Sequence, residues 1–69
     1  MNLPDIEVVS AAVHAAWMEI KLAQGVTSRL SETGEELMQP YAALSEAAKD
    51  LDRGTVWTVY AAIQKAAGE

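Results

Sequence analysis

Apolar residues recur at helical spacing in two long stretches of the chain. In the first, large apolar side chains follow one another at steps of three and four: Ile6, Val9, Val13, Trp17 and Ile20. This spacing puts them on one stripe of a helix. Pro4 suits a first helical turn, where its missing N–H costs nothing, and Gly25 is a natural C-terminal stop. The pattern predicts a helix over about residues 4–24.

The second stretch carries a similar stripe: Val56, Val59, Tyr60 and Ile63. Upstream, Ser45 is a good N-cap for a short helix on which Leu51 is expected to face inward. Asp52 is a possible second cap, and Gly54 is a weak point between the two segments. These segments are either one bent helix or two helices. The sequence favours a break near residues 52–54, with a short helix before it and a long helix after it.

Residues 26–40 lack sustained periodicity, and their centre, residues 31–36, is polar and turn-like. Two interpretations stay open for their backbone: short extended arms at residues 26–27 and 37–38, or a single helical turn over residues 35–38. The segment is either a solvated connection or a loop that contacts a ligand. The expected fold is all-α, one small helical domain over residues 1–69 with two long amphipathic helices packed antiparallel, a short helix and an irregular connecting segment.

Length changes what this pattern means for stability. A chain of 69 residues without cysteine has no disulfide to reinforce a small core, and no cluster of metal ligands replaces it. Association is the remaining ordinary source of stability, so we expect a homo-oligomer. Four large apolar residues fall off the two stripes and need cover: Val8, Met18, Leu22 and Trp57. They indicate a symmetric dimer through the outer helix faces.

The charge balance weighs against two classes of binding partner. Ten acidic and five basic side chains give a net charge of −5, and the basic residues are scattered. Neither a nucleic-acid polymer nor an anionic membrane is therefore an expected partner. No apolar run is long enough to span a bilayer, and Asp5 and Glu7 stand where a signal peptide would carry basic residues. The prediction is a cytoplasmic protein.

Few residues are candidates for catalysis or metal binding. The single histidine, His14, has no second histidine or cysteine to share a metal ion, and no nucleophile motif or glycine-rich phosphate loop accompanies it. The sequence therefore predicts neither an enzyme nor a cofactor. His14 is either a partly buried histidine bonded to a backbone group or a carboxylate, which is the favoured interpretation, or a direct ligand contact.

Aromatic and basic residues are the other candidates for binding. Trp17 lies on the core stripe, whereas Trp57 lies off it and is expected to be partly exposed. Either ring has a face on which a flat ligand could stack. Three basic residues would form a small pocket for phosphate or carboxylate if the fold brought them together: Lys21, Arg29 and Arg53. The alternative for Arg53 is a surface pair with a carboxylate.

Two motifs resemble the RyR domain, a small helical repeat first named in ryanodine receptors and also found in bacterial and phage proteins. They are His14-x-x-Trp17-x-x-x-Lys21-x-x-x-Gly25 and Pro40-Tyr41-x-x-Leu44-x-x-x-x-Lys49-x-x-Asp52-Arg53-x-Thr55-Val56. The resemblance spans roughly residues 9–66 and is weakest in the middle. It implies a binding module rather than an enzyme.

The resemblance also implies a role. RyR-like domains in bacteria and phages are associated with nucleotide signalling, so the expected function is to sense or sequester a small anionic, nucleotide-like ligand in phage–host conflict. The alternative is a protein–protein adaptor without a small ligand. The candidate ligand-binding residues are His14, Trp17, Lys21, Arg29, Tyr41, Arg53 and Trp57.

Overall fold

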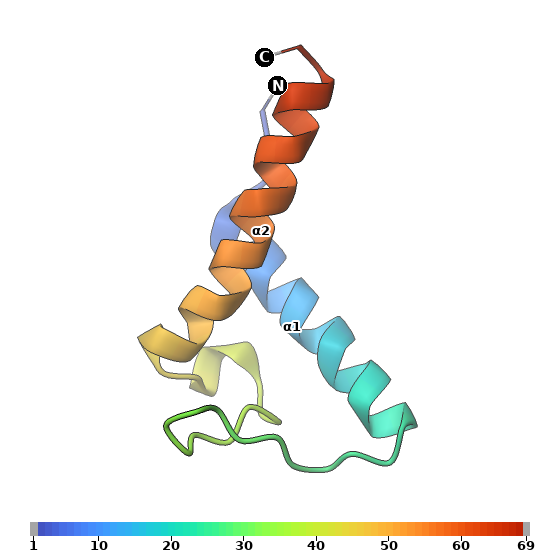
Figure 1. The fold of residues 1–69 in the computed structure, drawn as a ribbon, viewed down its shortest axis with the longest axis vertical. Helices are drawn as coiled ribbons and strands as arrows, with labels where there is room; N and C mark the ends of the chain where they lie inside the picture. The colour runs from blue at the N-terminus through green and yellow to red at the C-terminus, as the bar shows by residue number, and fades with distance from the viewer. Residues whose placement is uncertain (1, 69) are drawn as a thin grey trace.

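Two long helices cross and diverge, and the chain between them closes the open end (Figure 1). The computed structural model describes residues 2–68, with helix α1 at Ile6–Ala23, a 3-10 turn η1 at Tyr41–Ala43 and helix α2 at Glu46–Ala66. The helices run in opposite directions, and residues 24–45 span the gap between the end of α1 and the start of α2. The predicted all-α fold is confirmed. Neither described helix combines the length and apolarity needed to cross a bilayer.

Both ends of α1 are fixed by local chemistry. The Asp5 carboxylate accepts a hydrogen bond of 2.7 Å from the N–H of Glu7, as an N-cap does. At the other end Gly25 takes a φ of 81°. This left-handed residue lets the Val26 N–H reach back to the carbonyl of Lys21 at 2.9 Å, which closes the helix. The predicted helix of residues 4–24 is thus correct to within two residues at each end.

α2 is one continuous helix, so the predicted break near residues 52–54 is wrong. Ser45 caps it as expected, with its hydroxyl accepting from the Ala48 N–H at 3.2 Å. Gly54 is accommodated inside the helix, where it costs about 1 kcal/mol relative to alanine. Asp52 is not a cap but binds His14, and Leu51 is 62% exposed rather than inward-facing. The short helical element lies earlier than predicted, at η1.

The connecting segment folds as a small hairpin-like turn, which is close to the extended-arm interpretation but pairs Leu30 with Glu36. The Leu37 N–H donates to the Arg29 carbonyl at 2.7 Å, and the Ser31 N–H donates to the Glu35 carbonyl at 2.8 Å. The extended arms therefore lie nearer the centre of the segment than residues 26–27 and 37–38. No helical turn forms at residues 35–38.

The Glu36 carboxylate holds this turn from one side. It accepts hydrogen bonds from the Ser28 hydroxyl at 2.5 Å, the Arg29 N–H at 2.8 Å and the Met38 N–H at 3.0 Å. These donors, Ser28 first, lower the pKa of Glu36. One ionised side chain thus satisfies backbone groups that a regular strand ladder would otherwise pair.

The core is small and partly polar. Four apolar side chains are buried: Leu44, Ala48, Val56 and Tyr60. Ser10 and Val56, one from each helix, are the most deeply buried and mark the crossing. The predicted stripe on the C-terminal helix holds only for Val56 and Tyr60. Val59 lies between them but is exposed, and Ile63 is exposed beyond the part of α2 that α1 covers. All described positions after Tyr60 are exposed.

The buried side of α1 is rotated from the predicted stripe. Ser10 and His14 are buried, whereas Ile20 is 57% exposed and Trp17 is half-buried. The apolar stripe misplaces the core because the most buried positions of this helix carry polar side chains.

Ser10 gives a direct test of the crossing. Its hydroxyl is fully buried and finds no hydrogen-bond partner within residues 2–68. We expect Ser10→Ala to raise the free energy of unfolding by about 1 kcal/mol, because it removes an unpaired buried hydroxyl and improves helix propensity. Urea titration measures this change. Ser10→Thr is the control: it keeps the hydroxyl, adds a methyl group and should destabilise by overpacking. A less stable alanine variant would contradict the structure at this point.

Candidate functional site

The buried imidazole of His14 joins the three parts of the chain. Its side chain is 3% exposed, its Nε2 lies 2.8 Å from the Gln39 carbonyl oxygen, and its Nδ1 lies 3.1 Å from Oδ2 of Asp52. The first contact comes from the connecting segment and the second from α2, while His14 itself belongs to α1. The interpretation of His14 as a buried histidine bonded to backbone and carboxylate is confirmed.

Both neighbours of His14 are hydrogen-bond acceptors. A carbonyl oxygen only accepts, so Nε2 carries a hydrogen. A neutral imidazole has a single N–H, so the bond between Nδ1 and Asp52 needs one further proton, either on the ring or on the carboxyl group. Burial raises the pKa of Asp52, and the attraction and hydrogen bond of His14 oppose that rise. Besides the hydrogen on Nε2, His14 and Asp52 therefore share one further proton between Nδ1 and the carboxyl group.

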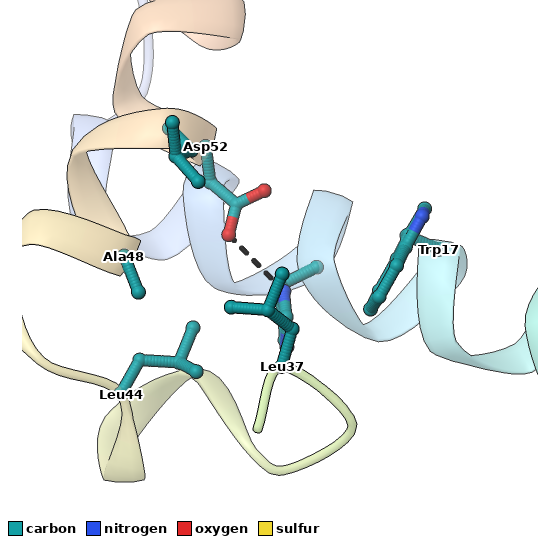
Figure 2. A pocket seen from close by; sticks show the side chains of 7 residues that line it. Trp17, Leu37, Leu44, Ala48 and Asp52 are labelled. Atoms are coloured by element: carbon teal, nitrogen blue, oxygen red, sulfur yellow. Dashed lines mark ion pairs between the residues drawn. The ribbon is translucent and has the colours of Figure 1, made fainter. Parts of the chain in front are cut away.

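A hollow of about 210 Å³ lies beside this pair (Figure 2). Trp17 stands on the α1 side of the hollow, and its ring centroid is 5.4 Å from that of His14. The lining comes from both helices and from the connecting segment: His14, Trp17, Leu37, Leu44, Ala48, Leu51 and Asp52. The divergence of the two helices produces this opening, and Leu37 and Leu44 line its other side.

A second hollow of about 420 Å³ adjoins the first. Both are lined by Ala48 and Leu51, and we refer to the two neighbouring hollows at the start of α2 together as the two-part groove. The remaining lining of the second hollow comes from the turn and α2: Leu30, Ser31, Glu32, Thr33, Glu35 and Ala47. Leu30 and Leu51 stand largely exposed at the groove.

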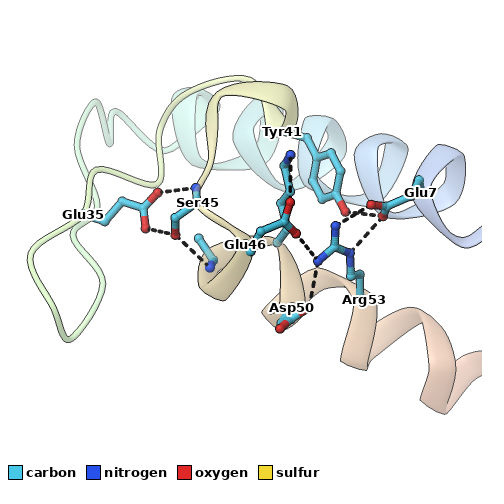
Figure 3. A network of polar contacts seen from close by, with 9 residues as sticks. Glu7, Glu35, Tyr41, Ser45, Glu46, Asp50 and Arg53 are labelled. Carbon is cyan, nitrogen blue, oxygen red and sulfur yellow. Dashed lines mark hydrogen bonds and ion pairs between the residues drawn. The ribbon is translucent and has the colours of Figure 1, made fainter.

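The groove is apolar with an acidic border. Glu32, Glu35 and Asp52 supply its carboxyl groups, and no Lys or Arg is among the described residues that line it. The Ser45 hydroxyl and N–H donate to the Glu35 carboxylate at 2.5 and 2.8 Å (Figure 3), which lowers the pKa of Glu35 and keeps it ionised. Such a groove suits an apolar group that is accompanied by positive charge.

Arg53 is engaged by three carboxylates outside the groove (Figure 3). Its Nε donates to Oε2 of Glu7 at 2.9 Å and its Nη2 to the other oxygen of the same carboxylate. Its Nη1 donates to Glu46 at 2.7 Å and to Asp50 at 2.8 Å. Hydrogen bonds from Arg53 and then Tyr41 lower the pKa of Glu7 to about 2. Arg53 thus ties the start of α1 to α2. Its N–H donors are occupied by these carboxylates and are not available to a phosphate group.

The structure brings some of the predicted ligand-binding residues together. His14 and Trp17 line the groove, and the Tyr41 ring lies 6.4 Å from the His14 ring. The Tyr41 hydroxyl donates to Glu7 at 2.6 Å, and the Lys49 ammonium sits 5.4 Å from the Tyr41 ring centroid.

Other predicted residues lie apart. Arg53 is bound at Glu7, and Lys21 is fourteen residues further along α1, about 21 Å at the helical rise. The expected basic pocket of Lys21, Arg29 and Arg53 therefore does not form around Arg53. Trp57 is 60% exposed, as expected, and meets Tyr60 edge-on at 6.1 Å outside the groove.

Sequence reasoning missed the apolar members of the groove, such as Leu30 and Leu37, because they belong to the segment without periodicity. Within residues 2–68, no three His, Cys, Asp or Glu side chains gather closely enough to hold a metal ion. No family model, curated protein or solved structure matches the chain.

The shared proton is tested at Asp52. In Asp52→Asn, the amide N–H can donate to Nδ1 of a neutral His14, so both bonds survive without the extra proton. We expect its free energy of unfolding to stay within about 0.5 kcal/mol of the wild type, whereas Asp52→Ala leaves Nδ1 unpaired and costs about 1–3 kcal/mol. Urea titration compares the two variants.

The same pair of variants gives a pH test. A raised carboxyl pKa means that the folded state holds the proton more tightly, so stability is lost as the pH rises above the ordinary value of 3.8. The free energy of unfolding of Asp52→Asn should therefore rise relative to that of the wild type as the pH increases. Equal losses in the Asn and Ala variants would contradict the shared proton.

The contacts of Glu7 predict that stability is lost as the pH falls, which is the opposite of the trend expected at Asp52. Because its pKa falls from 4.5 to about 2 on folding, its contribution is present above pH 4.5 and is lost as the pH falls towards 2. Glu7→Gln should have a lower melting temperature than the wild type at pH 7, with the difference vanishing near pH 2. Thermal melts by circular dichroism check this. Glu32→Gln, which removes an exposed carboxylate that forms none of the described ion pairs, should keep the wild-type pH profile.

Proposed function

We propose that this chain is a non-catalytic protein-interaction module. Its two-part groove binds an apolar side chain of a partner polypeptide that carries basic residues on either side. The observation that supports this proposal is the groove itself, which combines apolar walls with an acidic border and lacks cationic lining among the described residues. The RyR-like motifs, which imply a binding module, agree with it.

The size and exposure of the groove support an apolar anchor. Its larger part, about 420 Å³, is within the range of ordinary ligand pockets, about 300–1,000 Å³. Leu30 and Leu51 are 63% and 62% exposed at this groove, so a docked side chain would remove apolar surface from water on both sides. Each Å² of apolar surface buried contributes about 25 cal/mol.

Charge selects the flanking residues of the partner. Glu32 and Glu35 border the groove, and the whole chain carries a net charge of −5. Lysine or arginine beside the anchor would be attracted to this surface and would speed association. An acidic segment would be repelled, which gives the groove a means to discriminate.

The same charges weigh against the anionic, nucleotide-like ligand. Phosphate recognition depends on donors such as arginine, and Arg53 is already bound by Glu7, Glu46 and Asp50. The half-buried Trp17 offers a wall for stacking in the smaller hollow, but Asp52 stands opposite as a carboxyl group. The adaptor alternative is therefore better supported than the nucleotide one.

Catalysis finds no support in this site. His14 is held by Gln39 and Asp52 through both ring nitrogens, so neither nitrogen is available as a base towards a bound molecule.

Peptide titration tests the groove. Three probes share a leucine-rich centre and differ in their flanks: lysine, glutamate or glutamine. We expect the lysine-flanked peptide to bind most tightly and the glutamate-flanked peptide most weakly, with affinity falling as salt is added. Amide chemical shifts of the labelled protein locate the site, and the changes should centre on Leu30, Ala48 and Leu51.

A matched pair of variants controls this experiment. Leu51→Lys places a positive charge on the groove lining and should reduce binding at least tenfold. Val59→Lys makes the same change at an exposed position of α2 outside the groove and should leave binding unchanged. Cyclic dinucleotides and ADP-ribose are titrated in parallel. Shifts around Trp17 with a nucleotide, and none with any peptide, would refute the proposal in favour of the nucleotide ligand.

A further inference from the structure

The surface of α1 that faces away from α2 is almost entirely apolar. Apart from Glu7, which is paired with Arg53, its exposed positions define the α1 outer face: Val8, Ala12, Ala15, Ala16, Glu19, Ile20, Leu22 and Ala23. Glu19 is the only charged residue among them. The polar side chains of the helix lie elsewhere, since Ser10 and His14 are buried and Glu7 binds Arg53 from α2. α1 therefore carries polar residues at its two most buried positions and a nearly continuous apolar surface on the side that faces water.

The lone chain exposes more surface than its mass requires. Its accessible surface is 4720 Å². A folded monomer of 7.4 kDa is expected to expose about 4,200 Å². Its radius of gyration is 13.6 Å, against about 11 Å expected for a chain of this length. About 500 Å² per chain is therefore in excess. Two copies that each buried this excess would share about 1,000 Å², the lower limit of a stable interface.

We propose that the α1 outer face docks a second copy of this chain, with the two α1 helices packed antiparallel about a two-fold axis near Ala15. Small residues occupy the centre of the face, where Ala12, Ala15 and Ala16 permit close approach of the backbones. Bulky residues occupy its ends, so Val8 lies near Leu22 of the second copy. The face is thus complementary to itself, as a two-fold interface requires.

Charge favours the antiparallel arrangement over the parallel one. Parallel helices would set Glu19 against Glu19 of the second copy. In the antiparallel pair each Glu19 is four residues from the axis, so the two carboxylates are about 12 Å apart along the helices. That separation weakens their mutual repulsion relative to the parallel pair, in which the two carboxylates would lie side by side.

The dimer is independent of the proposed groove. Trp17 and His14, which line the groove, project from the other side of α1, so docking leaves the groove open. Each dimer then carries two grooves. Loss of the dimer and loss of peptide binding are separate results, because one is measured by mass and the other by titration.

Sedimentation equilibrium at micromolar concentration tests the assembly. We expect a mass of twice 7.4 kDa and a melting temperature that rises with protein concentration. Ala15→Glu should shift the mass to that of one chain or unfold the protein. Ala61→Glu makes the same change at an exposed position of α2 outside the face and should remain dimeric. A wild-type mass of one chain with a concentration-independent melting temperature overturns the proposal.

Cross-linking tests the position of the axis without disturbing the face. The chain has no cysteine, so a single introduced cysteine reports only on itself. Ala15→Cys should form a disulfide between copies under mild oxidation, because residues beside a two-fold axis approach within the roughly 7 Å limit for such a bond. Ala61→Cys should stay uncrosslinked. Equal cross-linking of both variants, or none in Ala15→Cys, overturns an axis near Ala15. Val8→Cys meets its own copy only in a parallel pair, so its cross-linking overturns the antiparallel arrangement.

Discussion

His14 joins α1, the connecting segment and α2, because its two ring nitrogens bind Gln39 and Asp52. Few other contacts hold the diverging ends of the helices in place, since the buried apolar set comprises only Leu44, Ala48, Val56 and Tyr60 among the described residues. A hydrogen-bonded imidazole fixes direction as well as distance, whereas an apolar contact fixes distance alone. The geometry of the groove therefore depends on a polar group in an otherwise sparse core.

The polar residues in the core have a consequence for the opposite side of α1. When Ser10 and His14 occupy the buried positions, apolar residues such as Val8, Ile20 and Leu22 of the same helix are left facing water. The ion pairs of Arg53 add to the effect, since they fill the contact between the start of α1 and α2 with charge. The polar interior and the apolar exterior are thus two results of one helical register, and the inferred dimer would cover the apolar exterior.

The parts of the fold that could be predicted are those set by neighbours in sequence. The caps at Ser45 and Gly25 were recognisable from residue type alone, since each acts within one turn. The break near residues 52–54 was wrong because Asp52 is held by His14, far away in the chain, and Gly54 costs the helix too little to interrupt it. Of the residues that line the groove, only His14 and Trp17 were among the predicted ligand-binding residues. The rest of the groove depends on the turn in the connecting segment. The hydrogen bonds of Glu35 and Glu36 that hold this turn leave no periodic pattern in the sequence, so the turn could not be predicted.

The exposed end of α2 has a consequence for hydrogen exchange. The helix continues to Ala66, yet every described side chain after Tyr60 is exposed, so its last turns lack tertiary support. Amides there open by fraying of the helix end, which takes little energy, while amides around Val56 exchange only when the crossing itself separates. One continuous helix thus contains two levels of protection, and the boundary between them falls near Tyr60, whose hydroxyl donates to the Pro4 carbonyl at 2.9 Å.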